Sequence, residues 1–138
     1  MGEDISLAAA TLHVSDRFGV DIYGDATFTS RDGRSAQLSF GMDNAYSCAL
    51  EIIGSTGTAY SNRIFTAPDN LAVKVLVNKK GDNKTINIEP FDQFQATLFE
   101  FARLTDDDDI RIATGKDILK HAKLVDEVKN NAIQVRYN

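Results

Sequence analysis

Apolar and polar residues alternate along the first two thirds of the chain. The period of two is clearest where Ala10, Leu12 and Val14 alternate with polar or small neighbours. The same alternation recurs in five further segments, at positions 26–29, 35–40, 47–53, 73–78 and 86–88. Such a pattern is typical of strands with one buried face and one more polar face. It predicts six or seven strands, which short connections make mostly antiparallel.

Three short segments between these strands predict turns. Asp32-Gly33 separates two alternating runs, and a two-residue Asp-Gly connection is a strong hairpin signal. Gly54–Gly57 contains two glycines in four residues, which suits a tight turn that needs a positive φ angle. Lys79–Lys84 is a polar turn before the last predicted strand of this region.

The pattern then changes to the period of a helix. Four large apolar residues lie three or four positions apart, namely Phe91, Phe94, Leu98 and Phe101. This spacing predicts an amphipathic helix. Pro90 stands at its start, where the missing N–H of proline costs nothing. Asp106–Asp109 is predicted to end the helix as a solvated loop.

A second helix is predicted to begin near Thr114. Thr114 and Asp117 have the spacing of a capping box. The apolar stripe of this helix is formed by Ile118, Ala122, Val125 and Val128. A short strand over Ile133–Arg136 is predicted to close the chain.

Strands followed by helices indicate an α+β fold. We expect residues 1–138 to form a single domain, an open and largely antiparallel mixed β-sheet of six to seven strands with two C-terminal helices packed on one face. Ile53 and Leu76 occupy strand positions where polar residues would be expected. One interpretation is that they form a partner surface on the open face of the sheet. The other is that a loop or bulge buries them.

Composition excludes several classes of protein. The 138 residues carry a net charge of −5, which argues against a nucleic-acid partner and against an anionic membrane surface. The single Cys48 cannot form an internal disulfide and suits a reducing compartment. No apolar run approaches the length of a membrane helix, and Met1–Asp4 lacks the basic start of a signal peptide. These features predict a cytoplasmic protein.

No self-contained catalytic arrangement is visible in the sequence. His13 and His121 have no partner at metal-ligand spacing, so no metal site is predicted. Cys48 alternates with apolar residues and is interpreted as a small buried hydrophobe. Gly54–Thr58 lacks the lysine and following helix of a phosphate loop, and no dinucleotide-binding glycine motif appears.

Four segments in order resemble the C-terminal domain of the glucose–fructose oxidoreductase / inositol dehydrogenase / rhizopine-catabolism (Gfo/Idh/MocA) family. They are Asp25–Ala36, Leu50–Thr58, Phe91–Phe101 and Thr114–Val128. The second is similar to the family's "eiiGtkG" strand and turn, which is the most specific of the four. Asn62–Asp69 is similar to a segment of members that act on nucleotide-linked sugars.

The resemblance implies a two-part enzyme. In this family an N-terminal Rossmann domain binds NAD or NADP, and the C-terminal domain lines the substrate pocket and forms the oligomer interface through its open sheet face. The Rossmann half, the family's catalytic lysine, and its helix with an aspartate and a histidine are absent here. No catalytic or cofactor-binding residue is therefore transferred to this chain, and we expect no cofactor in it.

Three functions remain open, and the last of them, a small enzyme or ligand carrier that uses the concave side of the sheet, has no convergent pattern of polar groups in its favour. The first is the substrate-binding and oligomerisation domain of an NAD(P)-dependent sugar or nucleotide-sugar oxidoreductase, inactive alone and dimeric through Ile53 and Leu76. Its candidate substrate residues are Arg63, which suits a phosphate or carboxylate, and Tyr46, which suits a sugar face. The alternative is a stand-alone interaction module that dimerises through the same open face.

Overall fold

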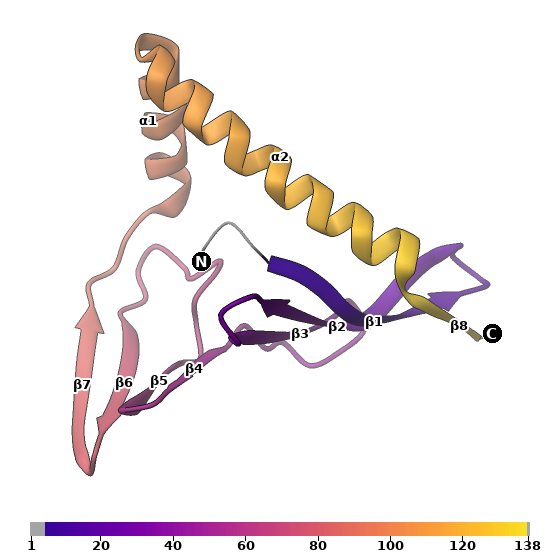
Figure 1. The fold of residues 1–138 in the computed structure, drawn as a ribbon. Coiled ribbons are helices and arrows are strands. Elements are labelled where there is room, and N and C mark those ends of the chain that lie inside the picture. The colour runs from indigo at the N-terminus through magenta and orange to yellow at the C-terminus, as the bar shows by residue number, and fades with distance from the viewer. Residues whose placement is uncertain (1–4, 138) are drawn as a thin grey trace. The chain divides into compact units, whose positions relative to one another are not determined.

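The computed structural model describes residues 5–137 and contains, within that range, eight strands and two helices (Figure 1). The strands form two four-stranded sheets that are mostly antiparallel, and the helices follow seven of the strands. The predicted α+β class is confirmed. The chain divides into a first unit, made of the residues up to Asn44 and from Asp109 onward, and a second unit, Ala45–Asp108. The prediction of one domain over 1–138 stays a prediction.

The first unit contains a mixed sheet with the strand order β3-β2-β1-β8. Its strands are β1 (Ile5–Ser15), β2 (Val20–Ser30), β3 (Ser35–Gly41) and β8 (Ile133–Tyr137). The first three are antiparallel, and β8 pairs in parallel with β1. The predicted C-terminal strand is therefore confirmed.

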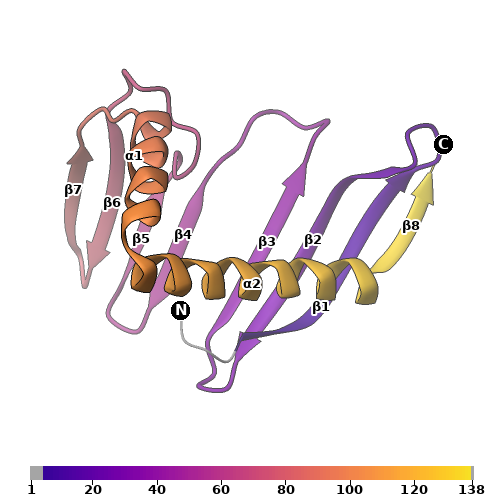
Figure 2. The ribbon, with the colours of Figure 1, turned by 90° about the horizontal axis from the view of Figure 1, so that it is seen from above.

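The core of the first unit lies between this sheet and α2 (Asp108–Asn131), which crosses one face of the sheet (Figure 2). Alternate residues of β1 and β2 are buried there, namely Ala10, Leu12, Val14, Ala26 and Phe28. Leu124, Val128 and Ala132 pack against the cluster of Ala10, Ala26 and Phe28. The alternation in the sequence predicted this face correctly.

We expect Phe28→Ala to lower the free energy of unfolding by about 3 kcal/mol, because it removes a buried ring and leaves a cavity. The measurement is the midpoint of denaturation by urea. Phe18→Ala, at an exposed ring in the same unit, is the control and should change stability by less than about 0.5 kcal/mol. Equal losses in the two variants would contradict this placement of the core.

The predicted Asp32-Gly33 turn joins β2 to β3, and Gly33 has a φ of 84°. The Asp32 carboxylate accepts hydrogen bonds from the side chains of Arg34 and Ser30 and forms an ion pair with Arg34. The hydrogen bond from Arg34 has the larger effect and that from Ser30 the smaller, and they lower the pKa of Asp32 to about 2. Because the pKa is depressed in the folded state, the stabilisation is present above about pH 4 and is lost as the pH falls toward 2.

We expect Arg34→Ala to move the titration midpoint of Asp32 upward, toward the ordinary value of an aspartate, because the principal hydrogen-bond donor is removed. The carbon chemical shift of the carboxyl group, followed from pH 1.5 to 6, measures this midpoint. Asp32→Asn identifies the signal. An unchanged midpoint in the Arg34 variant would show that the turn does not hold the carboxylate in this way.

The second unit contains an antiparallel sheet with the strand order β4-β5-β6-β7. Its strands are β4 (Leu50–Gly54), β5 (Gly57–Ser61), β6 (Val73–Lys79) and β7 (Asp82–Ile88). The predicted turn at Gly54–Gly57 is confirmed, but neither glycine has a positive φ. Gly57 is needed for another reason, because a Cβ atom there would lie 2.1 Å from the carbonyl oxygen of Asn78.

The helix boundaries differ from those predicted. Helix α1 spans Gln93–Asp106, and Asp92 caps it by accepting a hydrogen bond from the backbone N–H of Gln95. Only Asp107 separates α1 from α2, so the predicted acidic loop is wrong. Acidic residues are favourable in the first turn of a helix, which explains why α2 begins at Asp108. Thr114 lies inside α2 and does not cap it.

Candidate functional site

The two predicted substrate residues lie together in the second unit. The guanidinium carbon of Arg63 lies 4.2 Å from the centre of the Tyr46 ring, which is a cation–π contact. Neither residue is in a regular strand. A single parallel bridge between Cys48 and Arg63 brings their two segments side by side, and the backbone N–H of Ile64 donates to the carbonyl of Cys48 at 3.1 Å.

Arg63 is half-buried, and its charge is not neutralised by a neighbouring carboxylate among the described residues. Among residues 5–137, its guanidinium forms no ion pair with a carboxylate. The N–H donors of a guanidinium lie in one plane and match two oxygens of a phosphate or carboxylate. Arg63 and Tyr46, which we call the phosphate-binding cluster, can therefore bind an anionic group.

Thr66 extends this cluster. The hydroxyl groups of Tyr46 and Thr66 form a hydrogen bond of 3.0 Å, which fixes the far end of the tyrosine ring. Thr66 has a φ of 49°, a left-handed conformation that β-branched residues rarely adopt. The sequence pattern gave no sign of Thr66, because the residue lies in an irregular segment.

Cys48 is also part of the cluster, although it was interpreted as a small hydrophobe on a buried strand face. It is half-buried, lies before β4, and its sulfur accepts a hydrogen bond of 3.4 Å from the backbone N–H of Phe65. Burial raises the pKa of the thiol, but hydrogen bonds from Phe65, Ile64 and Tyr46 and the charge of Arg63 outweigh it. The net result is a pKa below the usual value of a cysteine.

We expect Tyr46→Phe to move the pH midpoint of Cys48 alkylation upward, because one of the groups that stabilise the thiolate is lost. The rate of reaction with iodoacetamide, followed by mass spectrometry between pH 6 and 10, measures this midpoint at the chain's one cysteine. Tyr60→Phe, in β5 of the same unit, is the matched control. Identical profiles for the two variants would contradict the contact between Tyr46 and the thiol.

The predicted interface residues share one face of the second sheet. Tyr60 of β5 pairs with Leu76 of β6 and with Glu51 of β4, and Ile53 lies two residues from Glu51 on the same face. Ile53 is 77% exposed and Leu76 is 48% exposed. The opposite face carries a larger apolar set, formed by Leu50, Ile52, Ala59, Val73, Val75, Val77, Ile86 and Ile88.

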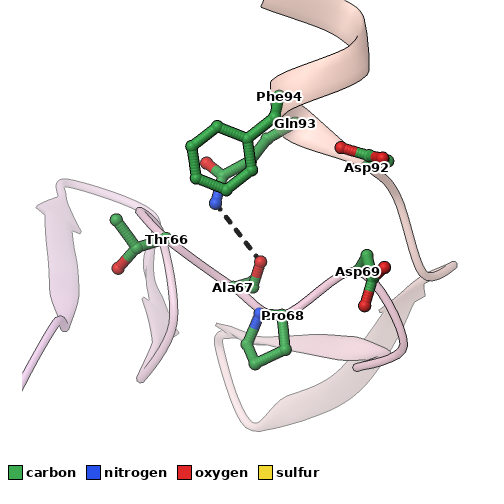
Figure 3. Close-up of a pocket in the computed structure, with 7 residues that line it drawn as sticks. All are labelled: Thr66, Ala67, Pro68, Asp69, Asp92, Gln93 and Phe94. Carbon is green, nitrogen blue, oxygen red and sulfur yellow. Dashed lines mark hydrogen bonds between the residues drawn. The ribbon is translucent and has the colours of Figure 1, made fainter.

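Each unit contains a cavity that is large enough for a small molecule. The cavity in the first unit has a volume of about 630 Å³, lies between α2 and the sheet, and is lined mostly by apolar side chains. The cavity in the second unit has a volume of about 370 Å³ and lies between Thr66–Asp69 and Asp92–Phe94 (Figure 3). Polar groups of Thr66, Asp69, Asp92 and Gln93 lie in its lining, and the hydrogen bond between Thr66 and Tyr46 connects it to Arg63.

Metal-ligating side chains are not grouped among the described residues. Within 5–137, no three His, Cys, Asp or Glu side chains are placed to hold a metal ion, and His13 stacks on Tyr23 with ring centres 4.5 Å apart. Among these residues no helix is both long and apolar enough to cross a membrane. Among the described residues, the parallel pair β1–β8 has no glycine-rich turn that leads into a helix.

Comparison with known proteins identifies similar enzymes, although no family model matches the chain. The chain is 33% identical, over 99% of its length, to the dTDP-3,4-didehydro-2,6-dideoxy-alpha-D-glucose 3-reductase of Actinomadura kijaniata. It is 30% identical, over 82% of its length, to the enzyme of the same name from Saccharopolyspora spinosa. The chain spans 41% and 32% of these two relatives.

The structure is similar to a solved one. It matches the crystal structure of a 3-ketoreductase from Actinomadura kijaniata in complex with TDP-benzene and NADP, with a TM-score of 0.87 and 30% identity. The match covers 100% of this chain and 44% of that chain. The chain is thus similar, over nearly its whole length, to part of nucleotide-sugar 3-ketoreductases.

Proposed function

We propose that this chain is the substrate-binding and oligomerisation domain of an NADP-dependent nucleotide-sugar ketoreductase of the Gfo/Idh/MocA type. The observation that carries the proposal is the half-buried Arg63 stacked on Tyr46 without a carboxylate partner among residues 5–137. The similarity to enzymes named for a dTDP-sugar substrate, one of them crystallised with TDP-benzene and NADP, supports it.

In this proposal Arg63 binds the diphosphate of the nucleotide sugar. Its planar N–H groups donate two parallel hydrogen bonds to phosphate oxygens, and Tyr46 holds the guanidinium in that orientation. Because this chain covers only 44% of the 3-ketoreductase that was crystallised with NADP, we assign the reduction of the sugar ketone to a part of the enzyme outside this chain. We place the enzyme in the cytoplasm and expect it to be a homodimer through the face of Ile53, Tyr60 and Leu76.

Titration of the chain with TDP tests the proposal. We expect amide NMR signals of Tyr46, Arg63 and Thr66 to shift with a dissociation constant in the millimolar range or below, because an arginine-bound phosphate is a strong charge-assisted contact. Thymidine at the same concentration, which lacks the diphosphate, is the control and should leave these three signals unchanged. If 10 mM TDP leaves these three signals unchanged, the assignment of Arg63 to the substrate is wrong.

A stand-alone interaction module is the second candidate function. The exposure of Ile53 and Leu76 on one sheet face favours it, because exposed apolar residues that share a face mark interaction surfaces. An antibody against the chain discriminates the two functions in extracts of the source cells. A polypeptide near 15.2 kDa would support the module. A polypeptide more than twice as large would support the enzyme, because the chain spans only 41% of its first relative.

A further inference from the structure

The cavity of the second unit is not used by the phosphate-binding role of Arg63. Its lining comes from two segments that lie about 25 positions apart, Thr66–Asp69 and Asp92–Phe94. The side-chain amide of Gln93 donates a hydrogen bond of 3.3 Å to the carbonyl of Ala67, which joins the two walls (Figure 3). We refer to it as the loop–helix cavity. Its volume of about 370 Å³ lies in the range of small-molecule sites.

The side chains of the loop–helix cavity have the chemistry that recognises a sugar. Asp69 brings a carboxylate that has no hydrogen-bond or ion-pair partner among residues 5–137. Asp92 brings a second carboxylate, one of whose oxygens caps α1. Phe94 is 76% exposed and offers an aromatic face. Ionised carboxylates only accept hydrogen bonds, so a ligand here must bring donors, and sugar hydroxyls are such donors.

The loop–helix cavity adjoins the phosphate-binding cluster through Thr66. The hydroxyl of Thr66 bonds to that of Tyr46, whose ring contacts Arg63, while Thr66 also lines the cavity. In a nucleoside diphosphate sugar, one ester oxygen joins the terminal phosphorus to the anomeric carbon of the sugar. A site for the sugar must therefore adjoin the site for the diphosphate, and this arrangement meets that requirement.

We propose that the loop–helix cavity is the glycosyl subsite, and that it takes a hexose with free hydroxyl groups attached to a nucleoside diphosphate. Asp69 accepts a hydrogen bond from a ring hydroxyl, and Phe94 contacts the C–H face of the ring. This inference rests on the proposed function, because it requires the diphosphate to be held by Arg63. It goes further in assigning the sugar-selective contacts to Asp69, Asp92 and Phe94.

The test compares the binding of TDP with that of TDP-glucose by titration calorimetry. We expect TDP-glucose to bind about tenfold more tightly than TDP, because it adds hydrogen bonds to a charged acceptor. Asp69→Ala should remove most of this advantage while leaving the affinity for TDP unchanged. Asp92→Asn is the second variant, since asparagine still caps the helix but lacks the charge. Asp82→Ala, an exposed aspartate in β7 of the same unit, is the matched control.

The outcomes separate this inference from the proposed function. Equal affinities for TDP and TDP-glucose would overturn the glycosyl subsite and leave the phosphate site standing. Equal weakening of both ligands by Asp69→Ala would overturn it as well, because the carboxylate would then act on the diphosphate or on folding. If neither ligand binds at 10 mM, the proposed function fails, and the glycosyl subsite fails with it.

Discussion

Arg63→Ala should weaken the binding of TDP by about 10- to 100-fold. The variant loses two charge-assisted hydrogen bonds to phosphate, and bonds of this kind contribute about 1.5–3 kcal/mol. Arg63→Lys should recover only part of the affinity, because an ammonium is a point charge and lacks the planar fork of donors. It should also lose the ring contact at 4.2 Å that orients the guanidinium on Tyr46. Titration calorimetry with TDP at constant salt measures both effects.

The matched control for Arg63→Ala is Arg34→Ala. Arg34 is an exposed arginine of the first unit that is paired with Asp32, so its removal changes the net charge equally without touching the cluster. We expect the control to bind TDP as the unchanged chain does. If both variants lose affinity to the same extent, TDP senses only the overall charge, and the specific role of Arg63 is contradicted. Full recovery by Arg63→Lys would contradict the bidentate geometry.

The double variant Ile53→Asp/Leu76→Asp should convert the expected dimer into a monomer, with at least a 100-fold rise in the dissociation constant. Both side chains are exposed on the same face of the second sheet. Two-fold pairing would bury the introduced carboxylates without partners, which costs about 2–5 kcal/mol for each. Light scattering during size exclusion should give twice 15.2 kDa for the unchanged chain and 15.2 kDa for the variant.

The control for the interface variant is Ile88→Asp. Ile88 is 48% exposed, as is Leu76, but it lies on the opposite face of the same sheet. The expected result is that Ile88→Asp leaves the mass at the dimer value. Dissociation by Ile88→Asp alone would move the interface to the larger apolar face. A monomeric unchanged chain across the concentration range would remove the homodimer from the proposal.

The core of the first unit could be predicted from the sequence because alternation reports burial directly. Ala10, Leu12, Val14, Ala26 and Phe28 all have the inward positions that the period of two assigns to them. The pairing of strands is a different property, since it depends on contacts between distant segments. The alternation therefore indicated six or seven strands in one sheet, whereas eight strands form two sheets.

Helix boundaries were missed where two physical effects compete. The four adjacent aspartates suggest a solvated loop by their polarity, but the field of a helix favours carboxylates in its first turn. In α2 the second effect prevails, and the helix begins at Asp108, six residues before the predicted Thr114. Gly115 did not prevent this extension, because one glycine inside a long helix costs only about 1 kcal/mol.

The candidate site was predicted in its side chains but not in its geometry. Arg63 and Tyr46 were chosen because of what arginine and tyrosine bind, and the structure places them in contact. Their contact depends on the bridge at Cys48, which no periodic pattern reveals. The cavity residues were missed for the same reason, since Thr66 and Asp69 lie in an irregular segment. The one signal for this segment was its resemblance to nucleotide-sugar enzymes.

The parallel pairing of β8 with β1 has a consequence for the order in which the protein folds during synthesis. The second unit is one continuous stretch, Ala45–Asp108, and leaves the ribosome complete. The first unit must wait for α2 and for β8, whose residues 133–137 pair with residues 11–15. Until then the apolar face of β1 and β2 has no helix over it. A chain terminated early would therefore carry a finished second unit and an aggregation-prone first unit.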